Sequence, residues 1–199
     1  MTTSFELGPP RSQRPRVAMR MTSIARSSSS KGRLPNGSRS DFVMPGSTLS
    51  TAEQAFLTGL ITRNVRFMIV GMSGALLQGA RGVTEDIDLW FEDVADPRIA
   101  EAVREAGGIW VSGAFGMGPP RIGGDALSER FDVVTSMTGL GAFAEEASHV
   151  RYEEVDGIRL PVLGLPRIVA SKTAANREKD RAVLPSLLDA LAALDESAR

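Results

Sequence analysis

Two aspartates separated by a single residue, Asp86 and Asp88, are the strongest candidates for chemistry in this sequence. Polar and apolar residues alternate strictly from Asp86 to Phe91, which predicts a half-buried β-strand. Successive side chains of a strand point to opposite faces, so the two carboxylates share one face, ~6–7 Å apart. Neighbouring carboxylates repel each other, and a divalent cation such as Mg²⁺ relieves the repulsion. The pair is therefore a candidate metal site.

A third carboxylate, Asp132, lies in a second short apolar segment between Arg130 and Thr135. Its neighbours Phe131 and Val133 belong in a core, so Asp132 faces the other way if the segment is a strand. If this strand lies beside the first acidic strand, Asp132 becomes a third ligand of the same metal site. The alternative is a solvated edge position without a chemical role.

A strand and a short helix are predicted ahead of the acidic pair. The apolar run Phe67–Val70 ends at Gly71, which is typical of a buried strand. The segment from Met72 to Gln78, which begins with several small residues, then predicts a short helix that stops at Gly79. The acidic pair thus follows a strand, a glycine turn and a short helix.

This order of elements resembles the signature of the DNA polymerase beta-type nucleotidyltransferase superfamily. In that signature a Gly followed by Gly or Ser precedes an Asp-x-Asp or Asp-x-Glu pair at a comparable spacing. Gly71 matches the first position, Met72 stands at the second, and Ser73 follows directly.

Many smaller members of the superfamily also carry an Arg and a Thr ahead of the acidic pair. Thr84 matches the Thr. Arg81 lies one residue earlier than the commonest spacing, and Gly82 stands in its place. These departures concern phosphate contacts rather than the acidic pair.

The resemblance covers about residues 50–192 and implies an α/β (α+β) nucleotidyltransferase fold, with a small mixed twisted sheet and flanking helices. It implies transfer of a nucleoside monophosphate from a nucleoside triphosphate to an acceptor hydroxyl, with release of pyrophosphate and with two Mg²⁺ ions as cofactors. The implied catalytic and metal-binding residues are Asp86, Asp88 and Asp132. The implied contacts to the nucleotide are Gly71, Ser73, Thr84 and Lys172.

The resembled group contains small stand-alone enzymes, among them abortive-infection and toxin–antitoxin nucleotidyltransferases and antibiotic adenylyltransferases. The acceptor is accordingly a tRNA, a protein or a small molecule, and an antitoxin is a candidate partner. A non-catalytic binding module is the alternative, in which the fold serves as a toxin–antitoxin partner or a nucleotide sensor.

The segment from Lys172 to Asp180 resembles a closing motif of these enzymes, in which a helix lysine approaches the active site. Pro166 opens the predicted helix, and Lys172 and Asn176 lie on one face of it. Lys179 follows one turn further if the helix persists. The alternative is a solvated basic face. Beyond this motif, Pro185 predicts a break before a last helix with a leucine stripe.

Charge divides the sequence into a basic tail and an acidic domain. Residues 1–46 hold eight of the 23 basic and two of the 24 acidic residues, and they are rich in Ser, Pro and Gly. We expect them to be disordered, with the nucleotidyltransferase domain at 47–197. The tail is interpreted as functionless, as an arm with weak nucleic-acid contact, as a transit peptide, or as the product of an upstream start codon.

Several site classes are excluded by composition. The absence of cysteine excludes disulfides and thiolate metal sites, and a single histidine, His149, excludes sites that need several. No apolar run approaches the ~18–20 residues of a membrane span, and no secretory signal is present. These features predict a cytoplasmic protein without membrane contact.

The remaining elements follow from local signals. Ser50 and Glu53 form a predicted capping box for a helix to about Arg63, and Pro97 opens a helix that ends at Gly107. The glycine-rich passage 111–124 is either a mobile loop over the site or a hairpin connection. A short helix is expected at 141–147 and a hairpin at 150–162, turning at Asp156-Gly157.

Overall fold

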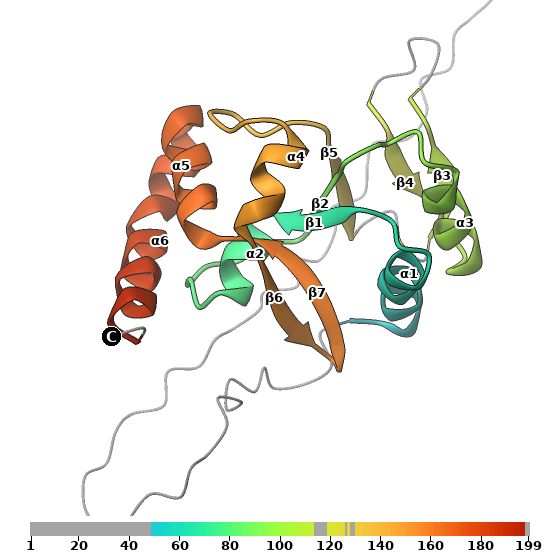
Figure 1. The fold of residues 1–199 in the computed structure, drawn as a ribbon, viewed down its shortest axis with the longest axis horizontal. Coiled ribbons are helices and arrows are strands. Elements are labelled where there is room, and N and C mark those ends of the chain that lie inside the picture. Colours follow the sequence, from blue (N-terminus) through green and yellow to red (C-terminus); the bar gives the residue numbers. More distant parts are fainter. Residues whose placement is uncertain (1–48, 114–118, 126, 128–129, 198–199) are drawn as a thin grey trace, which may run out of the picture. The chain divides into compact units, whose positions relative to one another are not determined.

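The computed structural model describes residues 49–113, 119–125, 127 and 130–197 (Figure 1). The predicted disordered tail at 1–46 lies outside the described residues. The helices are α1 (Thr51–Thr62), α2 (Gly71–Leu77), α3 (Pro97–Glu105), α4 (Phe143–Glu146), the 3₁₀ turn η2 (Ala147–His149), α5 (Leu165–Ala175) and α6 (Glu178–Ser197). The strands are β1 (Phe67–Val70), β2 (Ile87–Phe91), β3 (Ile109–Val111), β4 (Arg121–Gly123), β5 (Phe131–Val134), β6 (Val150–Val155) and β7 (Ile158–Leu163).

Five strands form one mixed sheet in the order β5-β2-β1-β7-β6. Strand β1 runs antiparallel to β2 and parallel to β7, and β2 runs parallel to β5. The β6–β7 hairpin completes the sheet, so β6 is an edge strand. The predicted fold class, a small mixed sheet flanked by helices, is confirmed.

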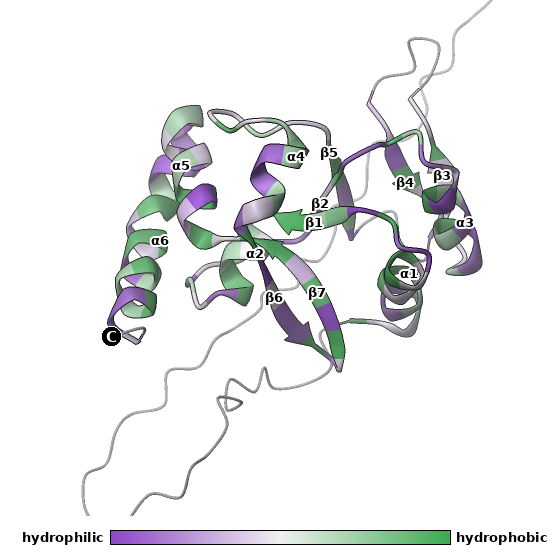
Figure 2. Cartoon of the chain, viewed as in Figure 1, coloured by the Kyte–Doolittle hydropathy of each residue, from purple (hydrophilic) through white to green (hydrophobic). Residues whose placement is uncertain are grey.

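The core consists of two apolar clusters that receive alternate residues of the strands. Ile69 and Leu89, which face each other across β1 and β2, belong to a first cluster together with residues of α1 and α3. Met68 and Trp90, the next facing pair, belong to a second cluster together with residues of α2, α5 and α6. Figure 2 shows hydrophobic colouring along β1 and hydrophilic colouring along β6, as expected for a central and an edge strand.

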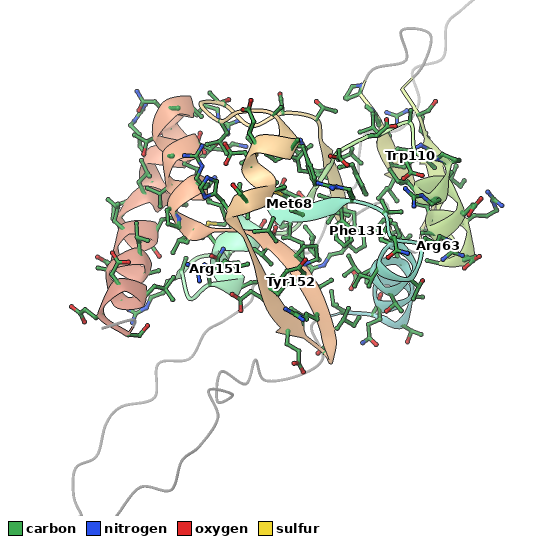
Figure 3. All side chains as sticks on the ribbon, in the orientation of Figure 1. Arg63, Met68, Trp110, Phe131, Arg151 and Tyr152 are labelled. Carbon is green, nitrogen blue, oxygen red and sulfur yellow. The ribbon has the colours of Figure 1, made fainter. Side chains whose placement is uncertain are left out.

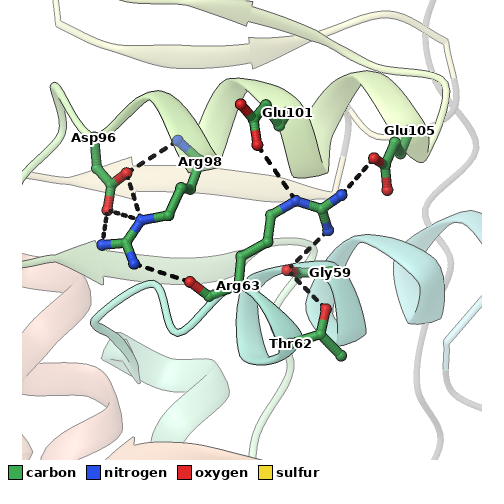
Figure 4. Close-up of polar contacts among 7 residues, drawn as sticks. All are labelled: Gly59, Thr62, Arg63, Asp96, Arg98, Glu101 and Glu105. Carbon is green, nitrogen blue, oxygen red and sulfur yellow. Dashed lines mark hydrogen bonds and ion pairs between the residues drawn. The ribbon is translucent and has the colours of Figure 1, made fainter.

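Helices α1 and α3 are joined by polar contacts as well as by the first cluster (Figure 4). Arg63 Nη1 donates to the Gly59 carbonyl at 3.2 Å, and the same guanidinium forms ion pairs with Glu101 and Glu105 of α3. Arg98 Nη1 in turn donates to the Arg63 carbonyl at 2.9 Å. Arg63 therefore both caps the end of α1 and ties it to α3.

The locally encoded elements match their predictions. The Ser50–Glu53 capping box is present, with Glu53 N–H donating to Ser50 Oγ at 3.2 Å. The glycine-rich passage contributes the antiparallel pair β3–β4, which confirms a hairpin; its tip, 114–118, lies outside the described residues. No helix in the described part of the chain has the length and apolar character needed to cross a bilayer.

The predicted break at Pro185 is wrong, and the condition set for Lys179, a persisting helix, is not met. The helix carrying Lys172 does not persist to Lys179, because Asn176 adopts a left-handed conformation (φ 47°) and ends α5. Helix α6 then runs through Pro185 without a break. Leu187 and Ala190 are buried in the second cluster beyond the proline, and this packing keeps the helix continuous although Pro185 cannot donate a backbone hydrogen bond.

Candidate active site

The structure places Asp88 and Asp132 directly opposite each other on neighbouring parallel strands, β2 and β5. The predicted adjacency of the two acidic strands is therefore confirmed. Asp88 shares its sheet face with Trp90, two residues along the strand, and so lies on the face of the second cluster. Asp86 immediately precedes the first residue of β2. All three acids thus come from the same end of two adjoining strands.

Electrostatic repulsion within the acidic group is visible at Asp88. The pKa of Asp88 is raised from 3.8 to about 6: burial contributes most, the negative charges of Asp132 and Asp86 act in the same direction, and Lys172 and Lys179 act in the opposite direction. A nearby cation stabilises a carboxylate whose ionised form is this unfavourable. The same interactions show that the two lysines belong to the surroundings of the acidic group.

The acidic group fits a hard divalent cation in its chemistry, since it offers only carboxylate oxygens. Among the described residues, however, no three His, Asp or Glu side chains converge closely enough to form a ready-made metal cluster. Gly71 leaves room for the Asp88 carboxylate, because a Cβ atom at position 71 would overlap Asp88 Oδ2. The donor set therefore suits a divalent cation in its chemistry, and the close approach of Asp88 to Gly71 constrains where its carboxylate lies.

Gly71 is required for a second reason, its backbone conformation. It begins α2 with φ 63°, in the left-handed region that side chains other than glycine rarely adopt. Gly71 thus turns the chain from β1 into α2 at the point where Asp88 approaches the backbone. This is the position of the first glycine in the predicted signature.

Gly71→Ala is expected to abolish activity and to destabilise the protein, because its Cβ displaces the Asp88 carboxylate and its backbone is strained by ~1–2 kcal/mol. Gly79→Ala is the matched control, since Gly79 also has positive φ (92°) but a Cβ there meets no atom within 4 Å. Thermal melts should show a loss in both variants, and activity assays a loss in Gly71→Ala alone. Equal activity in the two variants would contradict a role for the close approach of Asp88 to Gly71.

The hydroxyl groups predicted to contact phosphates are bonded to the backbone. Ser73 is buried; its Oγ donates to the Val70 carbonyl at 3.0 Å and accepts the Asp88 N–H at 3.2 Å. Thr84 Oγ1 donates to the Asp86 carbonyl at 3.0 Å. Both hydroxyls therefore hold the chain around the aspartates in place, which is a positioning role that the sequence did not indicate.

The two departures from the family signature, Met72 and Gly82, meet in space. Met72 is buried in the second cluster, and a Cβ on Gly82 would lie 2.5 Å from Met72 Cε. The Met72 side chain thus occupies volume that a larger residue at position 82 would need. It is a core residue of the second cluster.

The predicted phosphate contact Lys172 belongs to an ion network at the junction of α5 and α6, in which the central carboxylate, Asp180, is buried and Arg177 is exposed. Asp180 is fully buried and accepts hydrogen bonds from Lys172 Nζ at 3.2 Å and from Arg177 Nε at 2.6 Å. Burial alone would raise the pKa of Asp180, but the hydrogen bonds from Arg177 and Lys172 outweigh it and hold the pKa below its usual value. Asp180 therefore fixes two cations next to the acidic group.

Comparison with known proteins relates the chain to others by fold alone. The sequence matches no protein-family model, and the search of curated proteins finds no match. Among solved structures, ANT(2'')-Ia in complex with adenylyl-2''-tobramycin matches with a TM-score of 0.50 and 14% identity, over 73% of this chain and 90% of that chain. A solution structure of the antibiotic-resistance factor ANT(2'')-Ia matches with a TM-score of 0.44 and 15% identity, over 74% and 95%.

A third match is an antigenic nucleotidyltransferase-like protein from Paracoccidioides brasiliensis, with a TM-score of 0.44 and 15% identity over 69% of this chain and 75% of that chain. At 14% identity, the match to the ANT(2'')-Ia complex, with its TM-score of 0.50, establishes the fold alone. The arrangement of strands that brings the acidic residues together is accordingly that of the nucleotidyltransferase fold.

Proposed function

We propose that this chain, which has the nucleotidyltransferase fold, transfers a nucleoside monophosphate from a nucleoside triphosphate to an acceptor hydroxyl. The observation that carries the proposal is the pairing of Asp88 with Asp132 on adjoining parallel strands, with Asp86 at the same end. A purely structural sheet gains nothing from facing carboxylates, because each raises the cost of ionising the other.

Asp86, Asp88 and Asp132 are the residues that would hold Mg²⁺. When bound, two Mg²⁺ ions neutralise charge on the triphosphate and lower the pKa of the acceptor hydroxyl. Gly71 leaves room for the Asp88 carboxylate, while Ser73 accepts a hydrogen bond from the Asp88 backbone N–H. The chain thus positions its carboxylates rigidly, which is the protein's main contribution to phosphoryl transfer.

In the proposed reaction the acceptor oxygen forms a bond to the α-phosphorus, and the bond from this phosphorus to the bridging oxygen of the β-phosphate breaks. Pyrophosphate leaves, and Asp132, which is exposed, takes the acceptor proton. Lys172 and Lys179 interact with Asp88 through their charges and so lie within reach of a triphosphate held there. They would stabilise the negative charge of the leaving group.

The acceptor is proposed to be a hydroxyl of an RNA, a protein or a small molecule. The match to ANT(2'')-Ia with adenylyl-2''-tobramycin supports a test of small-molecule acceptors first, including tobramycin, and of ATP as the donor. If the acceptor is a protein or an RNA, an antitoxin is a proposed partner of the chain.

The proposal is tested by incubating the protein with each labelled triphosphate, Mg²⁺ and either tobramycin or a cell extract. Label should move to an acceptor, and a chelator or Asp132→Asn should stop it. Asp189→Asn is the control, because Asp189 is an exposed aspartate of α6 and its replacement should leave transfer unchanged. Absence of transfer from every triphosphate, or full activity in Asp132→Asn, would overturn the proposal.

A further inference from the structure

Strand β6 leaves one edge of the sheet unpaired within the described residues. Its residues Arg151, Tyr152 and Glu154 are exposed, and a hollow of about 620 Å³ follows the strand from Ser148 to Glu153. Figure 3 shows Arg151 and Tyr152 on this hairpin. An open edge strand can pair with a strand of another chain, and proteins normally protect such edges.

The hydrogen-bonding groups of β6 alternate between β7 and the open side. Gly164 N–H donates to the His149 carbonyl at 2.9 Å, and Val150 faces Leu163. In an antiparallel ladder every second pair exchanges hydrogen bonds, so residues 151, 153 and 155 bond to β7. The N–H and C=O groups of Val150, Tyr152 and Glu154 therefore point to the open edge.

We propose that this edge binds a second copy of the chain, with the two β6 strands antiparallel and Tyr152 facing Tyr152 of the second copy. A two-fold axis perpendicular to the sheet relates the two β6 strands and leaves every side chain on the same face of the joined sheet as in a single copy. Such an axis passes midway between one residue and the same residue of the second copy, so the pairing is centred on that residue. With Tyr152 at the centre, Arg151 faces Glu153 of the second copy, and the reverse pair forms as well. Opposite charges facing each other across strands are stabilising.

The charges on β6 select this register over its neighbours. Centring the pairing on Arg151 would place two arginines opposite each other, and centring it on Glu153 would do the same for two glutamates. Like charges directly opposite are destabilising. Only the Tyr152-centred register combines facing edge hydrogen bonds with opposite charges.

Tyr152 is already held in place for such a contact. The Arg159 guanidinium lies 4.4 Å from the centroid of the Tyr152 ring, while Tyr152 as a residue remains 57% exposed. Arg159 thus restricts the rotamers of Tyr152 before pairing, which lowers the entropy cost of association. The dimer would join two five-stranded sheets into one continuous sheet and does not depend on the proposed activity.

Charge exchange tests the pairing in the full-length protein by size-exclusion chromatography with light scattering. Wild type should move with concentration from 21.2 kDa toward twice that mass. Arg151→Glu should remain monomeric, and the double variant Arg151→Glu with Glu153→Arg should restore the dimer. Arg104→Glu, at an exposed position of α3, is the control and should dimerise like wild type.

A single introduced cysteine tests the register, because the chain contains no other cysteine. Cα atoms of a hydrogen-bonded antiparallel pair lie about 5.5 Å apart, within the range of a disulfide. Under mild oxidation Tyr152→Cys should form a covalent dimer, whereas Glu154→Cys, which faces Val150 of the second copy, should not.

Three outcomes would overturn the proposed dimer, and a fourth would exclude its register. The first is a wild type that stays monomeric at every concentration, and the second is a dimer that survives Arg151→Glu. The third is a dimer that forms only after residues 1–48 are deleted, which would show that the chain's own N-terminal segment covers the edge. Equal cross-linking of Tyr152→Cys and Glu154→Cys would likewise exclude the proposed register.

Discussion

Asp88→Asn is expected to eliminate nucleotide transfer without lowering the stability of the metal-free protein. Asp88 is ionised at neutral pH, although burial and the charges on Asp132 and Asp86 make its ionisation unfavourable. Its pKa of about 6, compared with 3.8, corresponds to a penalty of at most about 3 kcal/mol at neutral pH. Asparagine has nearly the same shape and removes this penalty, so the metal-free variant should melt at the same temperature or higher.

The pH dependence of this effect has a defined sign. A raised native pKa destabilises the fold once the carboxyl is ionised, so metal-free wild type should lose stability as the pH rises from about 4 to about 6. Asp88→Asn should lack this loss, and the two proteins should differ least below pH 4. Thermal melts in a chelator across this pH range measure the difference.

Ligand response separates a metal-binding Asp88 from a structural one. Mg²⁺ and nucleotide at ~100 times their dissociation constant should stabilise wild type by roughly 2.7 kcal/mol and leave Asp88→Asn unchanged. Asp189→Asn should respond like wild type, because Asp189 is exposed on α6. An Asp88→Asn protein that melts lower and still gains stability from Mg²⁺ and nucleotide would refute the metal-binding role.

Asp180→Asn is expected to cause the largest loss of stability among single charge removals. Asp180 is fully buried, and its removal leaves Lys172 and Arg177 without their shared partner. Breaking a buried ion pair on one side costs ~3–5 kcal/mol, and we expect the lower end of this range because the Arg177 side chain is exposed to water. At roughly 2–4 °C per kcal/mol for a chain of this size, the melting temperature should fall by on the order of 10 °C.

An exposed ion pair supplies the control for Asp180. Glu92 pairs with Arg66 at 2.7 Å, and both side chains are exposed, so Glu92→Gln should cost less than ~1 kcal/mol. The pKa of Asp180 is held below its usual value, so its stabilisation is present at neutral pH and is lost only as the pH falls below about 3.8. Equal melting temperatures for Asp180→Asn and Glu92→Gln would contradict a stabilising role of the network.

Elements encoded by adjacent residues were predictable from the sequence. The alternation from Asp86 to Phe91 indicated β2, and the Ser50–Glu53 pair indicated the start of α1. Asp156 and Gly157 both have positive φ (50° and 79°), as the predicted two-residue hairpin turn requires. In each case the determining interactions lie within a few residues along the chain.

Contacts between residues far apart in the sequence, or on either side of a helix end, were not predictable. The hydrogen bond between Ser73 and the Asp88 backbone depends on how α2 returns to the sheet. The pairing of Lys172 with Asp180 depends on the left-handed turn at Asn176, which no local pattern required. The acidic residues were therefore identifiable by type and spacing, whereas the residues that position them became evident only in three dimensions.

The division of the core into two clusters also distributes the chain's two tryptophans. Trp90 is buried in the second cluster, edge-on to Phe143 at 5.7 Å, on the same strand face as Asp88. Trp110 packs against the first cluster, edge-on to Phe91 at 6.2 Å. Each face of the sheet thus carries its own intrinsic fluorophore. With Trp110→Phe, emission from Trp90 follows the site-bearing face, and Trp90→Phe leaves a reporter of the opposite face, so unfolding of the two halves can be followed separately without an attached dye.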